Sequence, residues 1–321
     1  MKHLFNHILS NLSKNLTCLT PLSSRRGVGG EVGLFLLLIS CLLSACSENV
    51  TDIVPGNDNV AYVNFYNAME AAHQSLPSDS LGFYNMIYVN DSVPTAVFRN
   101  FPQFSESALD DKRQYPFHFT GTPYITDIAG GYGDVFWMPI TADTYKFIYT
   151  SRFKVFLKDT TVSLKPNTYT TQYITESPTT DSTYTVVTVP VEPKAAQGKV
   201  RVQIINLSTD WGAIDVYQVD ADGKVLTSTL PVNLLFGAYS AYAELDTANA
   251  DKNNKLVLKF RKNGESTASL TTTVPAISGS TYTLLVQGFI NETVRRIKKS
   301  NTGYISVDVM PDLRVNSRRM Y

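Results

Sequence analysis

The stretch that decides the fold is Gly198-Lys-Val-Arg-Val-Gln-Ile-Ile-Asn-Leu-Ser-Thr-Asp-Trp-Gly-Ala-Ile-Asp-Val-Tyr217. Apolar and polar residues alternate from Val200 to Ile204, which is the period of a β-strand. Asn206 opens a short run of turn-forming residues that ends at Gly212, and a second strand-like run begins at Ile214. We therefore expect one strand to end at Asn206 and the next to start at Ile214.

Comparable alternating runs recur along the chain, and turn-forming segments such as Asp220-Ala-Asp-Gly223 separate them. They are Val60–Tyr66, Tyr145–Tyr149, Thr183–Val189, Lys255–Lys262, Ser280–Phe289 and Gly303–Val309. Many short strands between turn signals are typical of sandwiches and barrels. We therefore expect an all-β protein built from antiparallel sandwiches.

The chain divides near its middle, where a segment at 190–198 contains two prolines and a glycine and resembles an interdomain linker. The halves look like diverged copies. Val63–Asn67 corresponds to Val202–Asn206, and Thr168-Tyr-Thr170 corresponds to Thr281-Tyr-Thr283. We predict tandem sandwiches at 60–189 and 199–321, the first of them with a long insert near 91–134.

Composition excludes some classes of function. The 321 residues carry 28 Lys plus Arg against 28 Asp plus Glu, so the formal net charge is zero. A nucleic-acid binder needs a basic surface to neutralise phosphates, and we expect no nucleic-acid partner.

Residues 1–45 have the layout of a lipoprotein signal peptide. A basic segment precedes 13 residues that are mostly apolar, Gly33 to Ala45, and Leu43-Ser-Ala-Cys46 resembles the lipobox of bacterial lipoproteins. A helix of that length rises only about 20 Å, too short for a bilayer core. We expect cleavage before Cys46 and lipid attachment to it, followed by a flexible tether over 46–59. The long basic segment is also compatible with a start codon placed too far upstream.

This arrangement predicts a lipid-anchored protein of the cell envelope, held in the outer membrane through Cys46. The sequence leaves open whether the protein faces the periplasm or the exterior. Without residues 1–45 the chain has 24 cations and 27 anions and no free thiol.

The segment Gly198–Tyr217, together with Phe236–Tyr242 and Thr281–Gly288, resembles the bacterial family called domain of unknown function 4397. The resemblance is clear over about 198–290 and faint over 60–190, and Thr209 and Trp211 depart from the family's usual residues. It implies immunoglobulin-like β-sandwiches, often in tandem on secreted or lipid-anchored proteins. It implies no reaction.

The sequence contains no recognisable catalytic or metal motif. Beyond the leader only His73 and His118 remain as histidines, and we take His118 as structural. We predict no catalytic residue, no metal site and no cofactor. The basic run Arg295–Lys299 is consistent with a charged edge strand or, as an alternative, with an anionic partner.

We therefore expect a non-catalytic binding or structural role, with a protein or glycan partner at the cell surface. One alternative is a glycan-binding accessory lipoprotein of polysaccharide uptake, in which Trp137, Trp211 and Tyr132 stack on sugars. Another is a hydrolase with dispersed carboxylates, which leaves no local mark in a sequence.

Overall fold

The structure is a computed structural model that describes residues 59–75, 83–107, 113–115, 117–118, 125–128, 131–192, 195–226 and 229–320. Residues 52–321 form one compact unit. The signal peptide, Cys46 and the tether predicted from the sequence lie outside the described residues. Among the described residues no helix is both long and apolar enough to cross a membrane.

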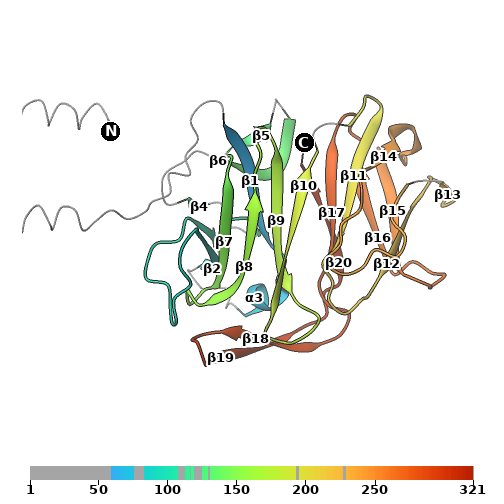
Figure 1. Cartoon of the computed structure of the whole chain (residues 1–321). Helices are drawn as coiled ribbons and strands as arrows, with labels where there is room; N and C mark the ends of the chain where they lie inside the picture. The colour runs from blue at the N-terminus through green and yellow to red at the C-terminus, as the bar shows by residue number, and fades with distance from the viewer. Residues whose placement is uncertain are drawn as a thin grey trace, which may run out of the picture. The chain divides into compact units, whose positions relative to one another are not determined.

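The first sandwich consists of two five-stranded sheets, with strand orders β10-β9-β1-β6-β5 and β4-β3-β2-β7-β8 (Figure 1). Its elements are β1 (Val60–Asn67), α3 (Glu70–Gln74), β2 (Phe83–Val89), β3 (Phe104–Ser107), β4 (Phe117–His118), β5 (Ile125–Ile128), β6 (Gly131–Thr141), β7 (Thr144–Ser151), β8 (Phe156–Ser163), β9 (Tyr169–Glu176) and β10 (Tyr184–Val191). Between the sheets lies an aromatic core, in which the Phe65 ring contacts those of Phe104, Tyr115 and Phe147.

The second sandwich pairs two four-stranded sheets, with orders β14-β11-β17-β20 and β13-β12-β15-β16. Its elements are β11 (Lys199–Asn206), β12 (Ile214–Val219), β13 (Val225–Leu226), β14 (Ala243–Asp246), the 3-10 turn η2 (Thr247–Asn249), β15 (Lys255–Lys262), β16 (Leu270–Pro275), β17 (Thr281–Gln287), β18 (Thr293–Lys298), β19 (Tyr304–Val309) and β20 (Arg314–Arg319). Strands β18 and β19 form a separate two-stranded sheet. The predicted fold class, two tandem β-sandwiches, is confirmed.

The two sandwiches share one strand order. β1 lies between β9, to which it is parallel, and the antiparallel β6, while β11 lies between the parallel β17 and the antiparallel β14. In the opposite sheets, β7 lies between β2 and β8 as β15 lies between β12 and β16. The expectation of purely antiparallel sheets therefore fails for one strand pair in each sandwich, because alternation along a strand does not reveal the direction of its neighbour.

The sequence match between the two Thr-Tyr-Thr segments is one residue out of register. Counting back from the pairs that Asn67 and Asn206 form, Tyr169 occupies the position of Thr281 rather than that of Tyr282. A shift of one residue moves a strand side chain to the other face of its sheet. Tyr282 is accordingly part of the core of the second sandwich, whereas Tyr169 is only partly buried at the end of its strand.

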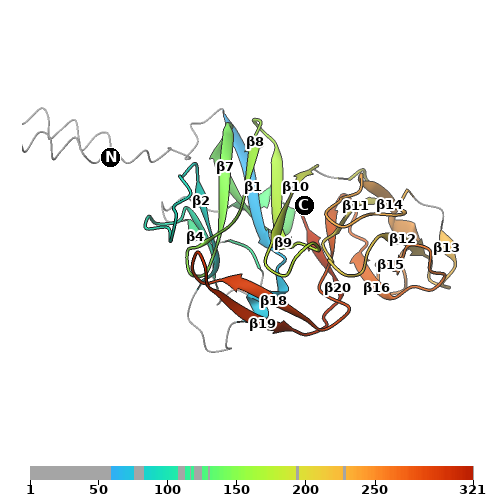
Figure 2. The ribbon, with the colours of Figure 1, turned by 60° about the horizontal axis from the view of Figure 1, so that its bottom comes forward.

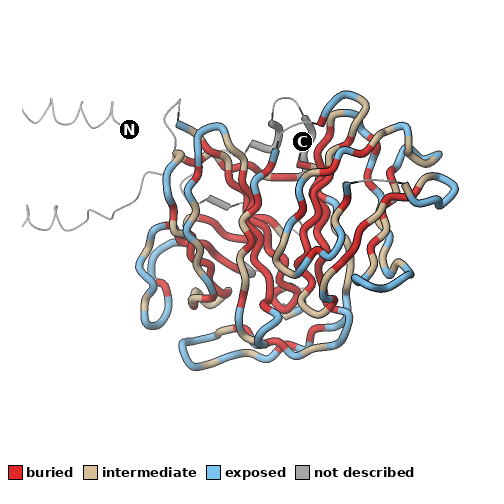
Figure 3. Tube along the Cα trace, turned by 45° about the vertical axis from the view of Figure 1, so that its right-hand side comes forward, coloured by how far each residue is buried: buried red, intermediate tan, exposed pale blue. Residues whose placement is uncertain are grey.

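The sandwiches pack against each other through the sheets that contain β9 and β17. A shared apolar cluster joins them, formed by Tyr66, Ala68, Tyr173, Val187, Val189, Ile205, Leu207 and Leu285. All seven residues of β17 are buried, and all but the first of β9. Figure 3 shows these buried runs in the middle of the molecule, with exposed residues gathered in the turns. Because both faces of the central strands are covered, polar residues such as Gln287 are buried there too.

A hairpin of β18 and β19, inserted between β17 and β20, packs against α3 of the first sandwich (Figure 2). Arg295 on β18 is 8% exposed and donates hydrogen bonds to the carbonyl oxygens of Ser177 at 3.0 Å and Thr180 at 2.8 Å. Arg296 pairs with Asp181 at 2.7 Å. Arg295 and Arg296 therefore connect the second sandwich to the loop that follows β9 in the first. We call these contacts of Arg295 and Arg296 the clasp.

Candidate functional site

Two of the three aromatic residues predicted to bind sugars, Trp137 and Trp211, are buried in the structure. Trp137 is 1% exposed and packs with Val135, Val191 and Met320. Trp211 is 2% exposed and belongs to the core of the second sandwich. A sugar ring can stack only on an open indole face, so both tryptophans are core residues instead. Tyr132 lies on β6, but its side chain is outside the described residues, as is the predicted lipidation residue Cys46.

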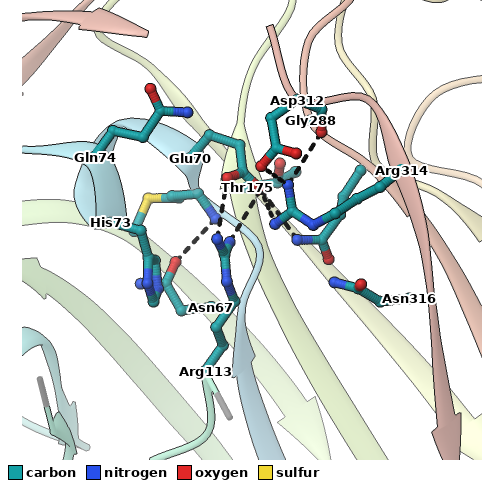
Figure 4. Close-up of polar contacts among 12 residues, drawn as sticks. Asn67, Glu70, His73, Gln74, Arg113, Thr175, Gly288, Asp312, Arg314 and Asn316 are labelled. Atoms are coloured by element: carbon teal, nitrogen blue, oxygen red, sulfur yellow. Dashed lines mark hydrogen bonds and ion pairs between the residues drawn. The ribbon is translucent and has the colours of Figure 1, made fainter. Parts of the chain in front are cut away.

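Charged residues far apart in the sequence meet where α3 faces the second sandwich (Figure 4). The carboxylate of Glu70 accepts two hydrogen bonds from the guanidinium of Arg113, each at 3.0 Å. It also accepts hydrogen bonds from Arg314 at 2.8 Å and from Gln287 at 3.0 Å. Arg314 in turn pairs with Asp312. We call Glu70, Arg113, Gln287 and Arg314 the ionic junction.

The ionic junction compensates the burial of its acid. Glu70 is 1% exposed, and burial alone would raise the pKa of its carboxyl group. The charges and hydrogen bonds of Arg113 and Arg314 outweigh burial and hold that pKa below its usual value. Glu70 is therefore ionised at neutral pH, and it links the first sandwich to β17 and β20 of the second.

A second buried carboxylate, that of Glu106, lies on the first-sandwich side of α3. It accepts a hydrogen bond from the side-chain amide of Asn67 at 2.6 Å, and its other oxygen lies 2.9 Å from Nε2 of His73. The side-chain oxygen of Asn67 accepts a hydrogen bond from the backbone N–H of Met69 at 2.9 Å. The strand end at Asn67 and the start of α3 are thereby fixed to β3.

A third buried carboxylate, that of Glu176 at the end of β9, accepts a hydrogen bond from the backbone N–H of Ala71 at 2.8 Å. Burial raises the pKa of Glu176 to about 7 against the effect of that hydrogen bond, and the negative charge of Glu70 adds to the rise. Glu70, at the start of α3, and Glu176, at the end of β9, thus have opposite pKa shifts. The physical cause is that two arginines stabilise the charged form of Glu70, whereas the Glu176 carboxylate accepts its hydrogen bond from the neutral N–H of Ala71.

These three carboxylates are the arrangement closest to the dispersed acids of the hydrolase alternative. Their residues Glu70, Glu106 and Glu176 are 1%, 0% and 3% exposed. A glycosidase needs space for a sugar ring between its two acids, and an inverting glycosidase needs space for a water molecule as well. In this structure the three buried carboxylates join α3 to both sandwiches through their hydrogen bonds and ion pairs. Among the described residues no group of three or more His, Cys, Asp or Glu is arranged to hold a metal ion.

A cavity of about 390 Å³ opens at the other end of β1 and β9. The turn between β8 and β9, the first residues of β9 and the end of β10 line it. The lining residues are Ser163, Lys165, Asn167, Thr168, Tyr169, Thr170, Pro190, Val191 and Glu192. We call it the Tyr169 cavity. Its volume falls within the range of small-ligand sites, roughly 300–1,000 Å³.

Aromatic packing fixes the ring of Tyr169 at this cavity. The ring of Tyr62 stacks on it, with centroids 4.7 Å apart and an angle of 10° between the planes. Trp137 packs at 5.2 Å and 76°, in an edge-to-face geometry. Trp137 therefore supports the cavity from behind, and Tyr169 is the aromatic residue that lines it.

Sequence reasoning missed both places. Glu70 and its partners Arg113, Gln287 and Arg314 are separated by 43, 217 and 244 positions, so no local pattern connects them. Tyr62 and Tyr169 each belong to a strand run like the others. The available signal in the sequence was a polar residue, Gln287, at the end of the mostly apolar strand β17. The structure shows that Gln287 is buried, because the second face of β17 is covered as well.

Comparisons with known proteins add little about ligands. No curated protein matches the sequence. A solved carbohydrate-binding module of family CBM26 from Eubacterium rectale Amy13K, in complex with maltoheptaose, is 14% identical with a TM-score of 0.19, over 79% of this chain and 98% of its own. A family 41 carbohydrate-binding module from streptococcal virulence factors is 15% identical with a TM-score of 0.20, over 66% and 84%. Scores this low do not bear on what this chain binds.

A family model supports the resemblance that the sequence suggested. The profile of the family described as "Domain of unknown function (DUF4397)" matches residues 121–217. This range includes the signature at 198–217 and the last strands of the first sandwich, but not 218–290, so its extent differs from the one expected. The match at 121–217 nevertheless confirms the resemblance of this chain to the DUF4397 family.

Proposed function

We propose that this protein is a lipid-anchored component of the cell envelope that binds a ligand or partner without catalysing a reaction. The observation that carries the proposal is that the two ends of β1 and β9 differ in their polar groups. At one end the ionisable groups are buried and paired with each other. At the other end a cavity lined by hydroxyl, amide and aromatic groups is open to a ligand.

The lipid anchor in this proposal rests on the sequence. The match of Leu43–Cys46 to a lipobox, at the end of an apolar run, supports attachment through Cys46. Lipidation with two or more acyl chains gives stable membrane binding, whereas one chain gives only marginal binding. The predicted tether over 46–59 would then place the first sandwich close to the outer membrane. Protease treatment of intact cells tests whether the protein lies on the periplasmic or the external side of that membrane.

The proposal is tested by chemical crosslinking in intact cells, followed by pull-down of the full chain. We expect capture of a specific partner, and loss of that capture when Cys46→Ser removes the anchor. The purified protein is assayed in parallel on a broad panel of polysaccharides, where we expect no hydrolysis.

The hydrolase alternative predicts a different result. If the buried acids were catalytic, hydrolysis would appear on the panel and would be lost in Glu176→Gln. Such a result would refute the non-catalytic proposal. So would a pull-down without any partner from a protein that is fully protected from protease.

A further inference from the structure

We infer that the Tyr169 cavity binds a neutral saccharide, with the hydroxyl and amide groups of the turn between β8 and β9 and the phenol hydroxyl of Tyr169 as its polar contacts. This inference rests on the proposed function, because it names the ligand class of that same cavity. Three properties of the cavity carry it: its charge, the distribution of its polar and apolar groups, and the rigidity of its walls.

The charges at the cavity are nearly balanced. Lys165 is the cation in the lining and Glu192 is the anion. The Glu192 carboxylate lies 3.2 Å from Arg201, whose guanidinium also pairs with Glu244 at 2.8 Å. A phosphorylated or polyanionic ligand is recognised by converging arginines and lysines. Lys165 and Glu192 carry opposite charges, and Arg201 is shared between two carboxylates, so the lining has no net charge and favours an uncharged ligand.

The lining combines short polar groups with apolar surface. Ser163, Thr168 and Thr170 carry hydroxyl groups that both donate and accept hydrogen bonds, and Asn167 carries an amide that does the same. Pro190 and Val191 contribute apolar atoms, as does the ring of Tyr169. A pyranose ring presents hydroxyl groups at its edges and C–H groups on its faces. It matches such a lining in both respects.

The polar wall is fixed before any ligand arrives. Asn167 has a left-handed backbone, with φ of 56°, and its N–H donates to the carbonyl oxygen of Val60 at 2.7 Å. The hydroxyl of Thr168 donates to the carbonyl oxygen of Lys165 at 2.7 Å. The Tyr169 ring is held between Tyr62 and Trp137. Because these residues are already ordered, binding does not have to include the entropy cost of ordering them. This saving is important for a ligand that binds with modest affinity.

The test uses the full mature protein in detergent, first on an array of neutral and acidic oligosaccharides and then in calorimetric titrations, with inorganic phosphate as a charged probe. Two substitutions remove polar groups without disturbing the fold. Asn167→Gly keeps a residue that tolerates positive φ, and Tyr169→Phe keeps the stacked ring. Matched controls are Asn233→Gly, at φ 58°, and Tyr239→Phe, at a tyrosine that is 42% exposed.

We expect a neutral saccharide to bind and each cavity variant to weaken binding about five- to tenfold, as the loss of one hydrogen bond does. Both control variants should bind as the wild type does. Three results would overturn the inference: no saccharide binds, phosphate or acidic saccharides bind in preference, or binding survives both cavity substitutions together. A partner captured in cells despite any of these would leave the proposed function standing, whereas hydrolysis would overturn the proposed function itself.

Discussion

Glu176→Gln should stabilise the protein at alkaline pH, which is unusual for a change at a buried, hydrogen-bonded residue. The glutamine oxygen can still accept the hydrogen bond from the N–H of Ala71, which the Glu176 carboxylate accepts at 2.8 Å. The folded protein raises the pKa of Glu176 from 4.5 to about 7. Between these two values the folded state holds a proton that the unfolded state has lost. Stability from this group is therefore complete below the lower value and declines as the pH rises to about 7.

The size of the effect follows from the two pKa values. A shift of roughly 2.5 pH units corresponds to about 3 kcal/mol at most, since each unit is worth about 1.4 kcal/mol. Glutamine cannot ionise, so the variant escapes this loss. The variant should exceed the wild type in free energy of unfolding by about 2 to 3 kcal/mol at pH 8, and by less than about 1 kcal/mol at pH 5.

Urea unfolding at pH 5 and pH 8 measures this difference, with tryptophan fluorescence as the signal. Trp137 and Trp211 are both buried, one in each sandwich, so Trp211→Phe leaves a probe of the first sandwich alone. Glu70→Gln is the contrasting variant. Because two arginines lower the pKa of Glu70, its replacement should destabilise the protein at neutral pH, where Arg113 loses its charged partner and Arg314 keeps only Asp312. If Glu176→Gln and the wild type showed parallel stability from pH 5 to pH 8, the reasoning about Glu176 would be refuted.

Three further predictions concern single residues. Gly288→Ala should destabilise the protein by about 3 kcal/mol or more in urea unfolding, because Gly288 has φ of 92° and an added Cβ would lie 1.9 Å from the carbonyl oxygen of Asp312; unchanged stability would contradict this. Arg295→Ala should leave the carbonyl oxygens of Ser177 and Thr180 without their donor and cost about 2 to 4 kcal/mol, with faster hydrogen exchange confined to β18 and β19 if the clasp opens locally. Cys46→Ser should move the protein from the membrane to the soluble fraction of lysed cells, and continued membrane association would count against the lipid anchor.

The sequence was sufficient for the strands and insufficient for the contacts between them. The alternation in Val200–Ile204 identifies β11, and the similarity of Val63–Asn67 to it identifies β1 as the corresponding strand. Periodicity shows which residues share a face of a strand, but not what covers that face. The outer faces of β9 and β17 would be solvated in a single sandwich, and here each is covered by the other sandwich. The apparent surface residue Gln287 is buried for this reason.

The candidate site was the least predictable part, for a related reason. An exposed tryptophan and a core tryptophan look alike in a sequence of alternating strands, and large aromatic residues are usually buried. Trp137 is a core residue that supports the cavity, whereas Tyr169 lines the cavity because it begins its strand at the end of the sheet. The position along the strand decided exposure, and the residue type did not.

Two of the polar connections between the sandwiches differ in strength, and this difference explains how the Tyr169 cavity can be rigid. Near the cavity, the pair between Arg201 and Glu192 is solvated, with Glu192 61% exposed, and such pairs contribute at most about 1 kcal/mol. At the far end, Glu70 is 1% exposed, and Arg314 cannot leave it without depriving a buried charge of one of its two ionic partners. The ionic junction, with the clasp and the apolar cluster between the sheets, therefore sets the orientation of the sandwiches. The Glu192 carboxylate beside the cavity can then exchange its bond to Arg201 for one to a ligand, and the orientation of the two sandwiches does not change.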